Sequence, residues 1–313
     1  MKDDTNPVNH HSSPYHVPVL FYETLDALQI KPDGIYVDCT FGGGGHSNGI
    51  LEKLGTDGRL IAFDQDSDAA QNIPADERVV FVQNNFRHLQ RFLRLHGFLK
   101  VDGILADLGV SSHQFDKGER GFSTRFEGPL DMRMDQRQEN TASNILKKYT
   151  EQQLHKLFEQ YGEVTNSKTL AKQVVQQRNH NPLQTIAQLK AMISPVVKGN
   201  PNKYLAQVFQ ALRIEVNNEL GALKEMLEQL PAVLKPGGRA AVITFHSLED
   251  RLVKNFFRNG TFDEEQQKSL LPDERKNDLK IITKKPIIAG EEEVKRNPRS
   301  RSAKLRVAER KEQ

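Results

Sequence analysis

The sequence predicts an α/β protein with a doubly wound, mostly parallel, seven-stranded sheet of the Rossmann-like kind and a small all-helical insertion. Three observations predict this fold class. Short runs rich in β-branched residues alternate with helical patterns over the first 108 residues, which is typical of βαβ units and a parallel sheet. Four consecutive glycines follow the first of these runs. After residue 108 the alternation stops, and helical patterns follow one another without strands.

Four strands are expected in the first part of the chain, at residues 35–38, 60–64, 79–82 and 104–108. The first two end in the acidic residues Asp38 and Asp64, and each leads through a loop into a helical pattern. Right-handed crossovers place the carboxyl ends of parallel strands at one edge of the sheet, where ligands bind. We therefore expect the functional site at this edge.

A helical insertion is expected after the fourth strand. Residues 109–136 are rich in Gly, Ser, Asp and Arg and are too polar for a core. Two capping-box patterns follow, Thr150 to Gln153 and Thr185 to Gln188, each ahead of apolar residues at helical spacing. They predict a helical domain at 137–204, for which we expect a role in substrate recognition. The main domain then comprises residues 16–136 and 205–313, and the polar residues 1–15 are expected to be a disordered tail.

The last third of the chain returns to the sheet. One long amphipathic helix is expected from Leu205, with an apolar face that reaches Leu227. The Lys-Pro-Gly-Gly sequence at 235–238 predicts the turn that ends it. Residues 239–245 predict a fifth strand that is buried on both faces, and 248–257 predict a further helix. Two final strands are expected at 280–283 and 304–308, as an antiparallel pair.

Composition limits the class of protein. The chain has 313 residues, with 44 Lys and Arg against 41 Asp and Glu, so its net charge does not by itself indicate a nucleic-acid partner. Cys39 is the one cysteine, which excludes an intramolecular disulfide and Cys-rich metal sites and favours a reducing compartment. No signal peptide, membrane span or metal-ligand spacing is apparent. We expect a cytoplasmic protein without membrane attachment or metal; whether it is a monomer or a homodimer stays open.

The glycines at 42–45 predict a ligand site. They let the chain turn sharply and approach a ligand closely, and the next helix offers free N–H groups to an anion. No G-x-G-x-x-G or P-loop spacing is present, while Asp64 is placed to accept hydrogen bonds from two ribose hydroxyls. The ligand therefore has the features of an adenosine without a pyrophosphate, although a purely structural turn is the alternative. Phe86, after the third strand, is expected to stack on adenine or to serve packing alone.

Asp107 is the candidate for chemistry, because it ends the fourth strand at the same sheet edge. An exocyclic base amine is a poor nucleophile, and a carboxylate that accepts its hydrogen localises the lone pair and orients it. Ser111 and Ser112 are expected to shape the substrate pocket. Asp107 as a loop cap or a cofactor contact is the alternative reading.

Eight motifs along the chain resemble those of one family, the bacterial cytosine-N4 methyltransferases of small-subunit ribosomal RNA known as RsmH or MraW. The resemblance runs from about Val17 to Arg310. The motifs begin at Asp38 (DCTFGGGGHS), Asp107 (DLGVSS), Arg120 (RGFS), Gly128 (GPLDMRMD), Phe209 (FQALRIEVN), Lys235 (KPGGR), Phe245 (FHSLEDR) and Asn297 (NPRSRS).

The resemblance implies a class I methyltransferase that uses S-adenosyl-L-methionine to methylate N4 of a cytidine in the decoding region of 16S rRNA. It implies cofactor contacts at Gly44, Gly45, His46, Asp64, Phe86, Asp107 and Gln114. Cys39, Gly43 and residues 203–206 depart from the family pattern. None of them is a proposed ligand, but the last departure puts RNA docking at the insertion in doubt.

Contacts to RNA are expected from clustered basic residues. Eight lie between residues 295 and 311, Arg299 and Arg301 among them, and such a cluster binds phosphates without sequence preference. Arg120, Arg125, Arg133 and Arg137 form a second candidate patch, where Phe122 and Phe126 either stack on a flipped base or anchor the loop. His246 is a candidate base or RNA contact, with a helix cap equally expected.

Two other functions stay open at this point. One is methylation of DNA, another RNA base or a protein, which the missing (D/N/S)-P-P-(Y/F) tetrapeptide makes less favoured for DNA. The other is an RNA-binding assembly factor that the cofactor only stabilises. The latter requires a defective substrate pocket, whereas Asp107 and its neighbours match the family pattern.

Overall fold

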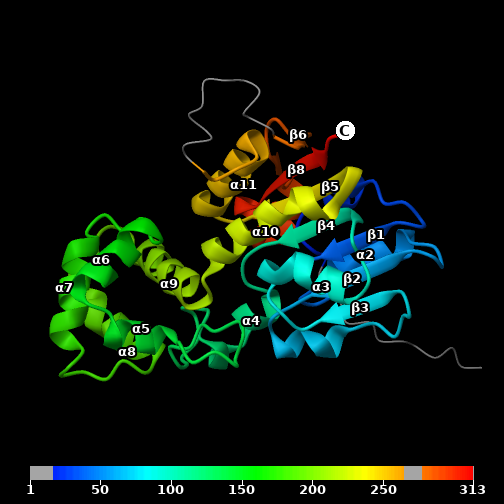
Figure 1. Ribbon diagram of the computed structural model, residues 1–313. Helices are drawn as coiled ribbons and strands as arrows, with labels where there is room; N and C mark the ends of the chain where they lie inside the picture. The colour runs from blue at the N-terminus through cyan, green and yellow to red at the C-terminus, as the bar shows by residue number, and fades with distance from the viewer. Residues whose placement is uncertain (1–16, 264–276, 313) are drawn as a thin grey trace, which may run out of the picture.

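A single mixed sheet forms the centre of the molecule (Figure 1). The computed structural model describes residues 17–263 and 277–312, so the predicted tail at 1–15 lies outside the described residues. Eight strands form the sheet in the order β3-β2-β1-β4-β5-β8-β6, and β7 also pairs with β8. The strands are β1 (Ile35–Asp38), β2 (Arg59–Phe63), β3 (Val79–Val82), β4 (Val101–Asp107), β5 (Leu234–Thr244), β6 (Leu279–Ile281), β7 (Ile287–Ile288) and β8 (Lys304–Arg310).

The strand order reverses between β1 and β4. Strands β1 to β5 pair in parallel, and β8 pairs antiparallel with β5, β6 and β7. In such a sheet the chains that leave two neighbouring strands turn to opposite faces, which opens a crevice at the carboxyl ends of β1 and β4. The predicted fold class is confirmed.

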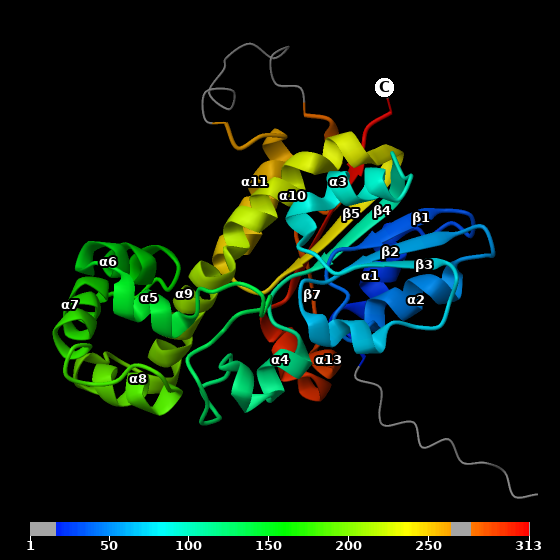
Figure 2. The ribbon, with the colours of Figure 1, turned by 60° about the horizontal axis from the view of Figure 1, so that its bottom comes forward.

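Helices cover both faces of the sheet, each over its own core (Figure 2). Side chains alternate between the faces along a strand, so Tyr36 packs with α1 (Phe21–Leu28) and α2 (Gly45–Lys53), whereas Val37 packs with the other face. That second face carries α3 (Leu89–Leu95), α10 (Glu219–Val233) and α11 (Ser247–Asn259). Loops occupy the edge of the sheet at the carboxyl ends of the parallel strands, between these two helical layers.

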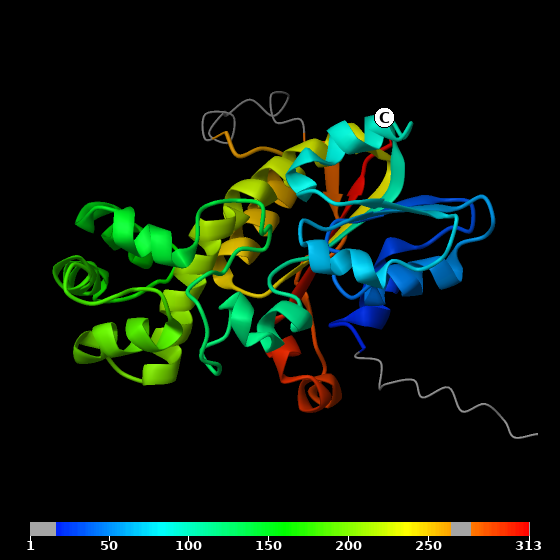
Figure 3. The ribbon, with the colours of Figure 1, turned by 90° about the horizontal axis from the view of Figure 1, so that it is seen from below.

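A separate helical lobe stands beside the sheet (Figures 1 and 3). It contains α5 (Ala142–Lys148), α6 (Glu151–Gln160), α7 (Ser167–Gln177), α8 (Ile186–Ile193) and much of α9 (Pro201–Asn217). These helices bury one apolar core of their own, which includes Phe158, Leu170 and Leu212. Both predicted capping boxes form, at Thr150 and at Thr185. The predicted domain boundary after residue 204 falls inside α9, because this helix serves the lobe and leads back to the sheet.

Short segments complete the chain. They are η1 (Ser67–Asn72), η2 (Phe86–His88), α4 (Ser112–Asp116), η3 (Gly118–Arg120), η4 (Ser194–Val196), α13 (Glu291–Arg296) and η6 (Pro298–Ser302). Of the helices described, none is long and apolar enough to cross a membrane.

Three predictions of elements were wrong in detail. The long helix expected from Leu205 is two helices, because Asn218 takes the left-handed conformation (φ 47°) between α9 and α10. The sheet has eight strands rather than seven, since β6 and β7 pair with opposite ends of β8. In addition, β5 starts at Leu234, five residues before the predicted start, so the predicted turn at 235–238 is an irregularity in its pairing with β4.

Candidate active site

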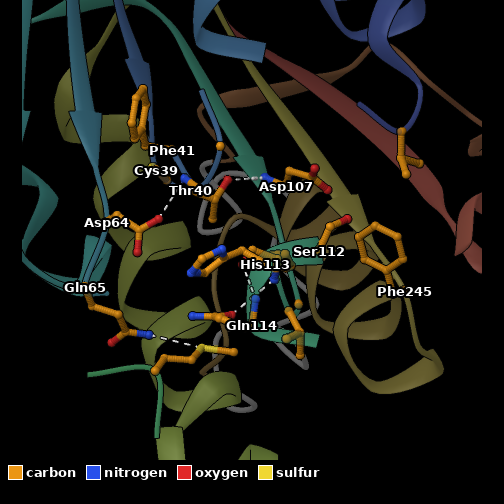
Figure 4. A pocket seen from close by; sticks show the side chains of 18 of the residues that line it. Cys39, Thr40, Phe41, Asp64, Gln65, Asp107, Ser112, His113, Gln114 and Phe245 are labelled. Atoms are coloured by element: carbon orange, nitrogen blue, oxygen red, sulfur yellow. Dashed lines mark hydrogen bonds between the residues drawn. The ribbon is translucent and has the colours of Figure 1, made fainter. Parts of the chain in front are cut away.

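One large pocket lies at the carboxyl ends of β1, β2, β4 and β5 (Figure 4). Its volume is about 540 Å³, within the range of sites that enclose a small-molecule ligand. The glycine loop, the segments after β2 and β3, the loop after β4 and the junction of α9 with α10 line it. The sheet thus brings together residues that lie far apart in the sequence.

The glycine loop is held open toward this pocket by two carboxylates. Gly42 has a φ of 52°, and its N–H donates to Asp64 Oδ2 over 2.8 Å. Gly44, with a φ of 77°, is the N-cap of α2. Asp38 is buried beneath the loop and accepts from the Thr40 N–H (3.0 Å) and the Ser47 hydroxyl (2.7 Å). Asp38 therefore shapes the loop from below, and Asp64 faces the pocket.

Asp64 is an acceptor in a poorly solvated place. Its Oδ1 accepts from the Asp66 N–H over 2.8 Å, which leaves lone pairs on both oxygens for further donors. Burial raises the pKa of Asp64 to about 6, against the two backbone hydrogen bonds that lower it. Phe86 lines the pocket from η2 and also packs in part against the core.

Asp107 has the least satisfied side chain in the pocket. Its Oδ1 is buried without a hydrogen-bond partner among the described residues, and its N–H donates to Thr40 Oγ1 over 2.7 Å (Figure 4). Burial, together with the charges of Asp38 and Glu249, raises the pKa of Asp107 well above its usual range. An acceptor in this state is ready for a donor that a ligand brings.

His46 lies beside Asp107, with its Nδ1 3.6 Å from Asp107 Oδ2. Its Nε2 is 3.2 Å from the carbonyl oxygen of Val19, which fits a proton on Nε2. Burial lowers the pKa of His46 to about 4, so the imidazole is neutral at pH 7. Neutral His46 therefore turns an unprotonated nitrogen toward Asp107.

The loop after β4 is fixed by a capping box at the start of α4. Ser111 Oγ accepts from the Gln114 N–H, and Gln114 Oε1 accepts from the Ser111 N–H, each over 3.1 Å. Gln114 Nε2 also donates to Asp66 Oδ2 over 2.6 Å. Both residues line the pocket, although the Gln114 amide is already bound within the protein.

Two basic residues predicted to contact RNA serve the protein's own structure. Arg120 is only 7% exposed, and it pairs with Asp66 (2.8 Å) and Asp68 (3.0 Å). The Arg120 guanidinium is thus buried and neutralised, which does not favour the predicted contact with RNA. Arg133 forms a two-point pair with Asp131 over 2.8 and 2.7 Å, which leaves it less available for phosphate than predicted.

His246 is the N-cap of α11. Its Nδ1 accepts from the Glu249 N–H over 3.4 Å. The structure thus favours the cap over the catalytic base. Phe122 is buried and anchors its loop, whereas Phe126 is exposed.

The carboxyl-terminal basic cluster is partly neutralised. Arg306 and Lys304 pair with Asp250, and Arg310 pairs with Asp278. Arg299 reaches the pocket mouth, where it donates to Ser112 Oγ and Asp116 Oδ1, both over 2.7 Å. Arg301 is exposed in η6.

Sequence reasoning missed three charged residues that line the pocket: Arg213, Glu219 and Glu249. Glu249 Oε2 accepts from the N–H groups of Phe245 (2.8 Å) and His246 (3.3 Å). Glu219, His246 and Glu249 could gather around a metal ion, since their ligand atoms lie within 4.8 Å of one another. Glu219, however, is engaged by Arg213, so these contacts favour an ion-pair network. The sequence did contain a signal for these residues, because they are charged residues on the apolar side of a predicted helix.

The fold and the pocket together define a class of protein. A parallel sheet that reverses between β1 and β4, a glycine loop after β1 and a carboxylate after β2 are the features of Rossmann-like methyltransferases that bind S-adenosyl-L-methionine.

The chain belongs to the MraW methylase family, whose model matches residues 13–311. It is 54% identical over 297 residues to ribosomal RNA small subunit methyltransferase H of Parabacteroides distasonis, and 52% identical over 300 residues to that of Christiangramia forsetii. Both alignments cover 94% of this chain and 97% of the relative. The family resemblance is confirmed, and with it a methyltransferase that uses S-adenosyl-L-methionine.

Proposed function

We propose that this enzyme methylates N4 of a cytidine in 16S rRNA of the small ribosomal subunit, in the cytoplasm. The observation that carries the proposal is the buried Oδ1 of Asp107 at the end of β4, which has no hydrogen-bond partner in the part of the chain that the structure describes. It supplies the acceptor that an exocyclic amine needs, beside a loop suited to the methyl donor. The names of the relatives support ribosomal RNA as the substrate.

The residues of the pocket fit the cofactor. Asp64 has free lone pairs for two ribose hydroxyls, and Phe86 offers a ring for adenine. Gly45 and the amino end of α2 offer backbone N–H groups to a carboxylate, whereas the Gly44 N–H already donates to the Phe41 carbonyl oxygen over 2.8 Å. When bound, S-adenosyl-L-methionine supplies a methyl group that its sulfonium already activates.

The protein's own part is alignment and proton removal. Asp107 accepts one N4 hydrogen, which localises the amine lone pair and orients it. N4 must lose a proton once its new bond has formed, and burial beside Asp38 and Glu249 makes Asp107 a stronger base than an ordinary carboxylate. His46 does not compete for that proton, because its own pKa is lowered to about 4.

The helical lobe is proposed to recognise the substrate. α9 runs directly from the core of the lobe to Arg213 in the pocket. RNA held by the lobe would thus be placed next to the reacting amine.

Methyl transfer tests the proposal. Small subunits that lack the modification are incubated with the enzyme and labelled cofactor, and the RNA is digested to nucleosides. We expect label in N4-methylcytidine alone. Label that appears only in DNA or protein, or in another nucleoside, overturns the proposal.

A further inference from the structure

Arg213 and Glu219 form a fixed ion pair in the wall of the pocket. Arg213 Nε donates to Glu219 Oε1 over 2.9 Å, and its Nη2 donates to Oε2 over 3.0 Å. The side chains are 18% and 11% exposed. A guanidinium has five N–H donors, so this fork leaves both donors of Nη1 unused. Nη1 has no hydrogen-bond partner within the described parts of the chain.

The break between the two helices creates this pair. Arg213 lies in the last turns of α9, and Glu219 is the first residue of α10. The left-handed Asn218 turns the chain between them, which lets Glu219 face a residue six positions earlier. Asn217 ties the same corner to the loop after β4, because its amide bonds the Met132 oxygen and the Met134 N–H, each over 2.8 Å. Arg213 is therefore held rigidly.

Strand order separates the two sides of the pocket. Asp64 follows β2 and the glycine loop follows β1, so the cofactor residues occupy one side. Asp107 ends β4 in the middle, and Phe245 and Glu249 follow β5 on the other side. Glu249 acts electrostatically on both Arg213 and Asp107. Arg213 thus lies on the side of the pocket that stays available to the target base when the cofactor is bound.

We propose that Arg213 recognises the target base by donating from Nη1 to O2 of cytosine, with Glu219 as the residue that positions it. The inference rests on the proposed function. Cytosine presents the N4 amine, the acceptor N3 and the acceptor O2 along one edge. Asp107 accepts a hydrogen bond from the amine, and Arg213 donates one to O2.

This arrangement selects cytosine against adenine. Adenine also carries an amine beside a ring nitrogen, but it has a C–H where cytosine has O2. Adenine would leave Nη1 without an acceptor on a side chain that is only 18% exposed, which weakens its binding relative to cytosine. Lysine in place of Arg213 would keep the positive charge but could not form the pair of parallel hydrogen bonds with Glu219.

Substitutions in enzyme and substrate test the contact. Arg213→Met alone would leave the Glu219 carboxylate without its cationic partner. The main variant therefore combines Arg213→Met with Glu219→Gln. Arg239→Met with Glu309→Gln is the matched control, because that Arg–Glu pair has the same 2.9 Å contact at the far end of β5. Small subunits are reconstituted with cytidine or 2-thiocytidine at the nucleotide where label has been mapped. Sulfur accepts hydrogen bonds more weakly than oxygen.

We expect the main variant to lose about 10- to 100-fold in kcat/KM on cytidine, the range for a hydrogen bond to a charged group. Wild-type enzyme and the control should prefer cytidine to 2-thiocytidine about tenfold, and the main variant should accept both equally. Cofactor affinity, measured by calorimetry, should stay at the wild-type value.

Three results would overturn the inference: wild-type kcat/KM in the main variant, an unchanged penalty for 2-thiocytidine, or weakened cofactor binding. A main variant that does not fold is replaced by Arg213→Lys, which should lose the same discrimination. If wild-type enzyme forms no N4-methylcytidine on the unmodified cytidine, the proposed function fails instead.

Discussion

At the scale of single residues, the two carboxylates of the pocket differ in how far their hydrogen-bonding capacity is used. Asp64 accepts two backbone N–H groups, whereas Asp107 Oδ1 accepts none from the described residues. The first arrangement suits a group that holds a ligand, and the second suits one that handles a proton. The two side chains can therefore be tested separately.

Asp107→Asn should lower kcat at least 100-fold, because an amide is a weak base and general-base catalysis contributes about that much or more. Single-turnover methyl transfer measures the rate, and calorimetry measures cofactor affinity. Asp57→Asn, in an exposed turn, is the control. An unchanged rate, or a loss of cofactor affinity that accounts for the whole effect, would assign Asp107 to the cofactor alone.

Cofactor affinity should fall in acid because of Asp64. Ribose hydroxyls donate to the ionised carboxylate, and the pKa of Asp64 without ligand is about 6. Affinity should therefore be constant well above pH 6 and about tenfold weaker at pH 5, where the proton competes with binding. Calorimetry at several pH values measures this. Asp64→Asn should bind weakly with no such pH dependence, and a flat wild-type profile would contradict the ribose assignment.

At the scale of elements, local patterns were predictive where one physical cause dominates. The first four strands lie within three residues of their predicted bounds, and the capping boxes at Thr150 and Thr185 form as the Thr-x-x-Gln spacing indicated. The break between α9 and α10 at Asn218 was not predicted, because apolar residues continue at helical spacing across it. β7 was not predicted, because its two residues are too few to show an alternating pattern.

Asn218 itself gives a prediction of stability. Its left-handed φ of 47° strains any residue with a Cβ that cannot form compensating local hydrogen bonds. Asn218→Ala should lower the free energy of unfolding by about 1 kcal/mol, while Asn218→Gly should be near wild type. Urea denaturation of the two variants measures the difference. Equal stability of Ala and Gly at this position would show that the turn relaxes.

At the scale of the whole molecule, the sequence indicated the cofactor half of the site better than the substrate half. Asp64, Phe86 and Asp107 follow predicted strands, so topology alone predicted their convergence. Arg213 and Glu249 come from helices that follow the insertion and β5, and their approach depends on how α9 and α11 pack. Ion pairing is equally invisible in sequence: Arg120 reads as a free cation, yet Asp66 and Asp68 neutralise it.

The surface around the pocket mouth then determines how RNA is captured. Within the described part of the basic cluster, Arg296 and Arg301 are exposed and have no ion pair, whereas Arg306 is paired. Each phosphate contact steepens the dependence of log affinity on log salt by about 0.7 to 0.9. Arg296→Ala with Arg301→Ala should therefore weaken binding of small-subunit RNA and reduce that slope by about 1.4 to 1.8.

Binding titrations over a range of salt concentrations measure the slope. Lys53→Ala is the control, because Lys53 is exposed at the end of α2 away from the glycine loop. Its slope should equal that of wild type. If the double variant also keeps the wild-type slope, RNA does not use this face, and capture falls to the helical lobe. Either result locates the RNA path relative to Arg299 at the pocket mouth, since η6 carries both Arg299 and Arg301.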